Sequence, residues 1–120
     1  MGLFSRKKRP PKDTSSVEFK RYMADRISDK LIKCVLQRND DYTDTIIGKS
    51  GFFVVKNGIL EIICESNTVF CGEIDTLTIW ELLSLDGVVI TGYDRTVDKE
   101  RTVMAYYKYY REVKDRKSVV

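Results

Sequence analysis

The dipeptide Asn57-Gly58 constrains the fold of this chain more than any other feature of the sequence. It separates two runs that are rich in apolar and β-branched residues, Phe52 to Lys56 and Ile59 to Glu65. Both central residues of a type I′ turn have a positive φ angle, which asparagine and glycine adopt more readily than other residues. The sequence therefore predicts a β-hairpin with a two-residue loop, and a loop of that length fixes the register of the two strands.

A second tight turn, predicted at Ser66-Asn67, adds a third strand to this hairpin. The expected cross-strand partners are Val55 with Leu60, Phe53 with Ile62, Cys64 with Val69, and Ile62 with Cys71. Both faces of the sheet are then apolar, one with Phe53, Val55, Leu60, Ile62, Cys64, Val69 and Cys71, the other with Phe52, Val54, Ile63 and Phe70. Because two apolar faces imply burial on both sides, we expect the rest of a barrel or sandwich on the first face and a helix across the second.

An amphipathic helix is predicted ahead of the hairpin. Ser15 and Glu18 have the spacing of a capping box. Apolar or amphipathic residues then recur with a helical period, at Phe19, Met23, Ile27, Leu31, Cys34 and Val35. The polar run 38–41 places the predicted end of this helix between Gln37 and Asp40. It is the cover available for the second face of the sheet.

The rest of the chain reads mainly as strands. Residues 73–85 fit either a strand or a helical turn, and Val88 to Asp94 and Arg101 to Tyr110 read as strands. On the last strand, Val103, Ala105, Tyr107 and Tyr109 share one face, and Met104, Tyr106 and Tyr110 share the other. The predicted fold class is α+β, mainly β: an N-terminal amphipathic helix packed on a small bent antiparallel sheet or open barrel of five to six strands. A single domain over 15–112 is expected between a basic arm at 1–14 and a basic tail at 113–120.

Composition argues against catalysis and metal binding. The chain has no histidine, which removes the commonest general base and metal ligand. Its three cysteines, an odd number, indicate free thiols in a reducing compartment rather than a disulfide framework, and we expect a cytoplasmic protein. The acids Asp40, Asp41 and Asp44 read as a solvated linker, and Asp75, Glu81 and Asp86 are the remaining candidates for paired carboxylates. We predict no catalytic residues, no metal and no cofactor, and a protein that is not an enzyme.

Charge separates the ends of the chain from its middle. Residues 1–12 carry a net charge of +5 and residues 108–117 a net charge of +3, whereas residues 13–107 carry −5. An acidic middle weighs against a phosphate-binding body and leaves that role to the two ends. The candidate anion contacts are Arg6, Lys7, Lys8, Arg9 and Lys12. The same arm allows weak contact with a membrane surface, although no run of the sequence is long and apolar enough to cross a bilayer.

Three short segments carry a resemblance: Ser84-Leu85-Asp86-Gly87-Val88, Gly92-Tyr93-Asp94 and Tyr106-Tyr107-Lys108-Tyr109-Tyr110-Arg111. Over roughly the last 70 residues, the chain resembles a group of small bacterial proteins of unknown function. The resemblance implies a bacterial domain and assigns no site.

Two functions remain open from the sequence. The first is a non-catalytic protein-interaction or assembly module, with a protein partner or a second copy contacted by Tyr106, Lys108, Tyr110 and Arg111. Interleaved aromatic and basic residues on a strand also suit single-stranded nucleic acid. The alternative is therefore a nucleic-acid-associated small barrel that binds phosphates through its basic tails.

Overall fold

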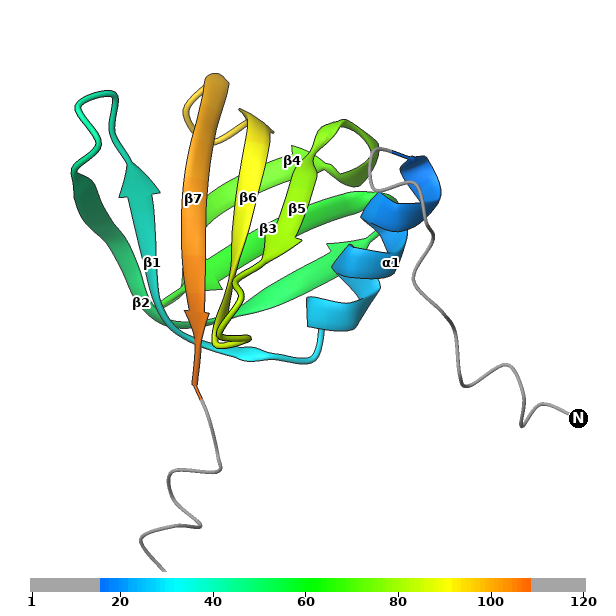
Figure 1. Cartoon of the computed structure of the whole chain (residues 1–120), viewed down its shortest axis with the longest axis horizontal. Helices are drawn as coiled ribbons and strands as arrows, with labels where there is room; N and C mark the ends of the chain where they lie inside the picture. The colour runs from blue at the N-terminus through cyan, green and yellow to red at the C-terminus, as the bar shows by residue number, and fades with distance from the viewer. Residues whose placement is uncertain (1–15, 109–120) are drawn as a thin grey trace, which may run out of the picture.

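A computed structural model describes residues 16–108 of the chain, which form one helix, one short 3-10 helix and seven strands (Figure 1). The elements are α1 (Val17–Ile27), β1 (Leu31–Arg38), β2 (Asp44–Lys56), β3 (Ile59–Cys64), β4 (Asn67–Glu73), η2 (Ile74–Thr76), β5 (Thr78–Glu81), β6 (Gly87–Asp94) and β7 (Lys99–Tyr107). The mainly β class is thus confirmed, with seven strands in place of the five to six predicted. No helix within 16–108 has the length and apolar character that a bilayer crossing requires.

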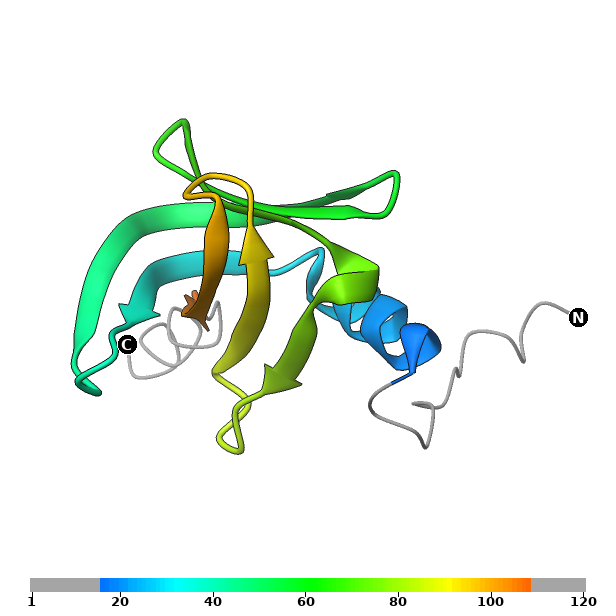
Figure 2. The ribbon, with the colours of Figure 1, turned by 90° about the horizontal axis from the view of Figure 1, so that it is seen from above.

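All seven strands belong to one antiparallel sheet in the order β4-β3-β2-β1-β7-β6-β5. The sheet curls, so that the β3–β4 hairpin lies across from β5 and β6, and α1 lies at the open side between them (Figure 2). The curl brings the edge of β4 against the end of β6, where the Arg95 amide donates to the Cys71 carbonyl over 2.7 Å. The fold is therefore an open sheet curled into an incomplete barrel, with a helix beside the gap.

The hairpin at Asn57-Gly58 is confirmed. Asn57 and Gly58 have φ angles of 54° and 76°, and the paired residues of β2 and β3 include Val55 with Leu60 and Phe53 with Ile62. The second turn was placed one residue too late. Glu65 and Ser66 are its two left-handed residues, and a bulge opposite Ile62 and Ile63 shifts the register of β4. Cys64 therefore pairs with Asn67, and Ile62 pairs with Phe70.

That bulge corrects the predicted faces. Phe70 turns inward and joins Phe53, Leu60 and Ile62 in the core, instead of lying on the opposite face. The helix packs on this same inner face, because Phe19, Met23, Ala24 and Ile27 belong to the same core cluster. The second face has no helical cover within the described residues, and Phe52 on it is 45% exposed. The prediction that α1 covers the second face was therefore wrong.

The helix is also shorter than predicted. Ser16, one residue after the expected cap, accepts a hydrogen bond from the Phe19 amide at 3.1 Å. The helix ends at Ile27, and Leu31 to Arg38 form β1 in the middle of the sheet. Apolar residues four apart continue into β1, but there Ile32 and Val35 are buried while Leu31 is 37% exposed. A shift in the β1–β7 register between Ile32 and Cys34 produces this inward pair three residues apart, which mimics a helical period.

The later strands agree more closely with expectation. β6 covers the predicted strand from Val88 to Asp94 and begins one residue earlier. On β7, Val103, Ala105 and Tyr107 are buried on the core side as predicted, whereas Tyr109 and Tyr110 lie outside the described residues. The segment 73–85 resolves into η2 followed by the edge strand β5.

Candidate functional site

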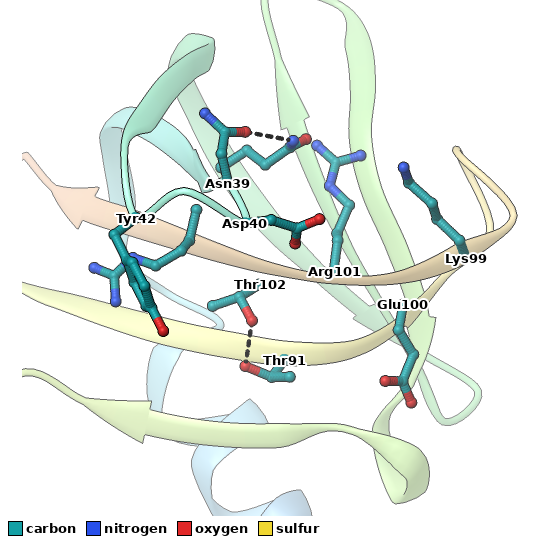
Figure 3. Close-up of a pocket in the computed structure, with 10 residues that line it drawn as sticks. Asn39, Asp40, Tyr42, Thr91, Lys99, Glu100, Arg101 and Thr102 are labelled. Carbon is teal, nitrogen blue, oxygen red and sulfur yellow. Dashed lines mark hydrogen bonds between the residues drawn. The ribbon is translucent and has the colours of Figure 1, made fainter.

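A polar pocket of about 620 Å³ opens where β1 stops pairing with β7. The last pair between these strands is Arg38 with Thr102, and the turn between β1 and β2 then leaves β7 uncovered along Lys99 to Arg101. Figure 3 shows Asp40 extending its carboxylate from this turn towards β7, with the Thr91–Thr102 pair below. The pocket is lined by Gln37, Arg38, Asn39, Asp40, Tyr42, Thr91, Lys99, Glu100, Arg101 and Thr102.

The charged groups of this pocket have both signs, and several are unengaged. The Arg38 guanidinium lies 3.3 Å from Asp44, and Arg101 pairs with Asp94, so both cations are already balanced. The side chains of Lys99, Asp40 and Glu100 form no hydrogen bond or ion pair with any residue of the described part. The pocket therefore offers one free ammonium and two free carboxylates beside a pair of hydroxyls, those of Thr91 and Thr102, which lie 3.0 Å apart.

Tyr42 lies in the β1–β2 turn and has an unfavourable backbone conformation. Its φ angle is 66° and its side chain is 86% exposed. Side chains other than those of glycine, asparagine and aspartate rarely occupy this left-handed region, which costs roughly 1–2 kcal/mol. The turn holds it there through two backbone hydrogen bonds, from the Asn39 amide to the Thr43 carbonyl at 2.8 Å and from the Tyr42 amide to the Asn39 carbonyl at 3.0 Å.

Asp41 stiffens the same turn from outside the pocket. Its carboxylate accepts from the Thr43 amide at 3.1 Å and from the Thr43 hydroxyl at 2.6 Å. These hydrogen bonds hold the pKa of Asp41 below its usual value. The acids Asp40, Asp41 and Asp44 were predicted to be a linker that ends the helix; instead Asp40 and Asp41 lie in the turn between β1 and β2, and Asp44 begins β2. Asp41 braces this turn while Asp40 faces the pocket.

Behind the pocket lies a buried ion pair. The side chain of Arg101 is 8% exposed and that of Asp94 is fully buried, with Nη1 of Arg101 2.9 Å from Oδ2 of Asp94. The other oxygen of Asp94 accepts from the Cys71 amide at 3.0 Å and from the amide and hydroxyl of Thr96, each at 2.9 Å. The buried Nε of Arg101 has no hydrogen-bond partner among the described residues. One face of the pocket is therefore backed by a cation that Asp94 holds in place.

A second surface, apolar rather than polar, occupies the opposite end of the sheet. The turn between β5 and β6, residues 82–86, projects from the lower end in Figure 1, whereas the turns between β1 and β2 and between β6 and β7 lie at the upper end. Leu83 in this turn is fully exposed, Leu85 is 57% exposed, and Trp80 on β5 is 46% exposed. We call these three residues the apolar turn surface.

Groups with potential for covalent chemistry are held apart by different partners. Asp75 pairs with Arg21 at 2.8 Å, Glu81 pairs with Arg26 at 2.9 Å, and Asp86 is hydrogen-bonded by Ser84. Burial and then the neighbouring Glu61 raise the pKa of the Cys71 thiol, which keeps it protonated and weakly nucleophilic. Within residues 16–108, no three side chains of the metal-ligating types converge.

The predicted contact residues are only partly described. Tyr106 is half-buried on the second face of the sheet, and Lys108 is exposed at its end. Tyr110, Arg111 and the basic arm from Arg6 to Lys12 lie outside the described residues. The structure does not bring Tyr106 or Lys108 into the polar pocket, whereas Tyr106 pairs with Gly87 at the end of the β5–β6 turn, beside the apolar turn surface.

Sequence reasoning missed the residues that define both surfaces. A signal existed for one of them, because Leu82-Leu83-Ser84-Leu85 precedes the turn dipeptide Asp86-Gly87, and leucines in a turn have no core to enter. Tyr42 gave no signal, since its φ angle and its place beside β7 depend on how β1 pairs with the last strand. No protein family, curated protein or solved structure matches this chain.

Proposed function

We propose that this chain is a non-catalytic protein-interaction module that binds its partner through the apolar turn surface. The observation that carries this proposal is the full exposure of Leu83 in the β5–β6 turn, with Leu85 and Trp80 exposed beside it in six consecutive residues. Large apolar side chains gathered in one place on a surface mark contact sites more often than isolated ones do. Burying a leucine side chain contributes about 1.5–3 kcal/mol.

The surface is held in shape before any partner arrives. The Leu82 amide donates to the Gly87 carbonyl at 2.9 Å, and the Leu85 amide donates to the Leu82 carbonyl at 2.8 Å. Trp80 rests against Phe19 of α1, with ring centroids 5.8 Å apart. A contact surface with a fixed backbone loses little conformational entropy on binding, which favours affinity.

Polar groups surround the leucines and suit the rim of an interface. Ser84 lies between Leu83 and Leu85 and donates to Asp86, whereas Glu81 is largely buried in its pair with Arg26. An apolar centre with a polar, solvent-accessible rim is the usual anatomy of a protein–protein contact. The partner is therefore a protein with an apolar depression that receives Leu83 and Leu85.

Site-specific photo-crosslinking in cells tests this proposal. A photoreactive phenylalanine analogue replaces Leu83 in one variant and Val97 in the other; Val97 is 40% exposed in the turn at the other end of β6. We expect a discrete crosslinked species, either a heterologous complex or a dimer of this chain, from position 83 only. The substitution Leu85→Asp should abolish it.

Two results would contradict the proposal. One is a crosslinking pattern that is the same from positions 83 and 97, since partner binding would then not depend on which end of the sheet carries the probe. The other is a species from position 83 that survives Leu85→Asp, because a charged side chain inside an apolar contact should remove most of its affinity. Circular dichroism of each variant checks that the sheet is retained.

A further inference from the structure

We propose that the polar pocket between the β1–β2 turn and β7 binds a neutral polyhydroxylated ligand, an oligosaccharide, which stacks on Tyr42 and hydrogen-bonds to Asp40 and Lys99. This site lies at the end of the sheet opposite the apolar turn surface and does not depend on the function proposed for that surface. Its volume of about 620 Å³ is within the usual range for ligand pockets, about 300–1,000 Å³.

The free charges of the pocket select against a charged ligand. A polyanion attracted by Lys99 would also face the unpaired carboxylates of Asp40 and Glu100. A polycation attracted by these carboxylates would also face the free ammonium of Lys99. A ligand of either charge would therefore be repelled by part of the lining. An uncharged ligand with many hydrogen-bonding groups avoids this repulsion and can form strong hydrogen bonds with both the ammonium and the carboxylates.

A hydroxyl group matches this lining because it donates and accepts at the same oxygen. One sugar hydroxyl can donate to the Asp40 carboxylate, another can accept from the Lys99 ammonium, and a third can pair with the hydroxyls of Thr91 and Thr102. The lining has no large aliphatic side chain, so an apolar ligand would leave these polar groups buried and unpaired, at a cost of roughly 1–3 kcal/mol each.

Tyr42 supplies the flat surface that a sugar ring requires. Its ring lies at one side of the pocket, with the hydroxyl on the side of Thr91 (Figure 3). Tyrosine offers a rigid amphipathic contact area at low entropic cost, since only two side-chain torsions need to be held. An 86% exposed tyrosine in a left-handed backbone conformation gives nothing to the core, so a contact with a ligand is the role that accounts for it.

The buried guanidinium of Arg101 forms a fixed wall of the pocket. Its side chain is more than nine-tenths buried, it lines the pocket, and its Nε is without a hydrogen-bond partner in the described part of the chain. Asp94 holds the guanidinium in place, so this wall of the pocket keeps its shape when a ligand enters.

The test is a titration of the full chain, followed by the amide resonances of residues 37–42 and 99–102 in ¹H–¹⁵N spectra. The probes are cellotetraose, chitotetraose and maltotetraose, each at up to about 10 mM, a concentration that detects millimolar dissociation constants. We expect at least one of them to shift these resonances selectively. The variant Tyr42→Asn should weaken that binding by about tenfold or more. It should not lower the unfolding midpoint, because asparagine accepts a positive φ angle.

The control is Phe52→Asn, which removes an exposed aromatic ring that lies on β2 and away from the pocket. This variant should leave the dissociation constant unchanged. Inorganic phosphate and an oligothymidylate serve as anionic probes. The proposal is overturned if none of the tetrasaccharides moves the pocket resonances, if Tyr42→Asn binds as well as the wild type, or if only the anions bind. None of these results bears on crosslinking at position 83, so the two proposals fail separately.

Discussion

Among single residues, Asp94 does most to close the fold. Its carboxylate is fully buried at the end of β6 and is bound by the Cys71 amide of β4, by Thr96 of the following turn and by Arg101 of β7. A buried carboxylate without such partners would be strongly unfavourable. With them, it joins the free edge of β4 to the opposite end of the sheet and holds the cation that backs the polar pocket.

Breaking this pair from the arginine side should be strongly destabilising. We expect Arg101→Met to lower the free energy of unfolding by about 3–5 kcal/mol, because it leaves the charge of Asp94 buried and unpaired. The exposed pair of Arg95 and Glu73 provides the control: its atoms are 2.8 Å apart, against 2.9 Å in the buried pair, but both side chains are about half exposed. Arg95→Met should cost less than about 1 kcal/mol.

Urea denaturation of both variants measures the difference. The double variant Asp94→Asn with Arg101→Met should lose less stability than the sum of the two single changes, because the second substitution removes the charge that the first one strands. Equal losses for Arg101→Met and Arg95→Met would show that burial of the pair is unimportant.

Among the secondary-structure elements, the β2–β3 hairpin is the one that local sequence determines most completely. The Asn57-Gly58 loop matches the twist of its strands, so the register followed from two residues and was confirmed. The helix shows the opposite case. Apolar residues spaced by four continue past its true end at Ile27 into β1, where Leu31 is exposed and Val35 is buried.

The turn can be tested by a substitution that meets no steric obstacle. An added Cβ at Gly58 has no atom within 4 Å, so its effect is purely conformational. We expect Gly58→Val to lower the free energy of unfolding by about 1–2 kcal/mol, since valine resists a φ angle of 76°. Lys56→Val introduces the same side chain at an exposed strand position and should cost little. Urea titrations that gave both variants the same loss would contradict the assignment of strain to the turn.

At the scale of the whole molecule, charge pairs tie the helix to the curled sheet. Arg21 of α1 donates two hydrogen bonds to Asp75 of η2, at 3.0 and 2.8 Å, and Arg26 pairs with Glu81 of β5. The hydrogen bond from Arg21 lowers the pKa of Asp75 below its ordinary value of 3.8. The helix therefore lies beside the gap in the barrel with ion pairs at its surface as well as apolar contacts beneath.

This lowered pKa predicts a weak dependence of stability on acid. A carboxylate whose pKa is lower in the folded state than in the unfolded state stabilises the fold. Its contribution to the free energy of unfolding is complete above the unfolded pKa and is lost as the pH falls through the folded pKa. For Asp75 the loss begins below about pH 4 and is small, since the pair is exposed to solvent. Urea midpoints measured from about pH 6 to about pH 2 should fall less steeply in Asp75→Asn than in the wild type.

Asp25→Asn is the matched control, because the Asp25 carboxylate lies on the same helix and has no partner within residues 16–108. Its acid profile should match that of the wild type. If instead Asp75→Asn and Asp25→Asn flatten the profile equally, the Arg21–Asp75 pair is not what couples the helix to pH.

The amino-acid sequence by itself determined the mainly β class, the β2–β3 hairpin with its register, the inner face of β7 and the apolar stripe of α1. These features depend on torsion angles and periodicities that neighbouring residues impose on each other. Only the tertiary structure decided that α1 packs on the inner face, that Phe70 turns inward, and that Tyr42, Asp40 and Lys99 surround one pocket. Those outcomes depend on bulges and on the pairing of β1 with β7, whose residues are far apart in the chain, so no local pattern encodes them.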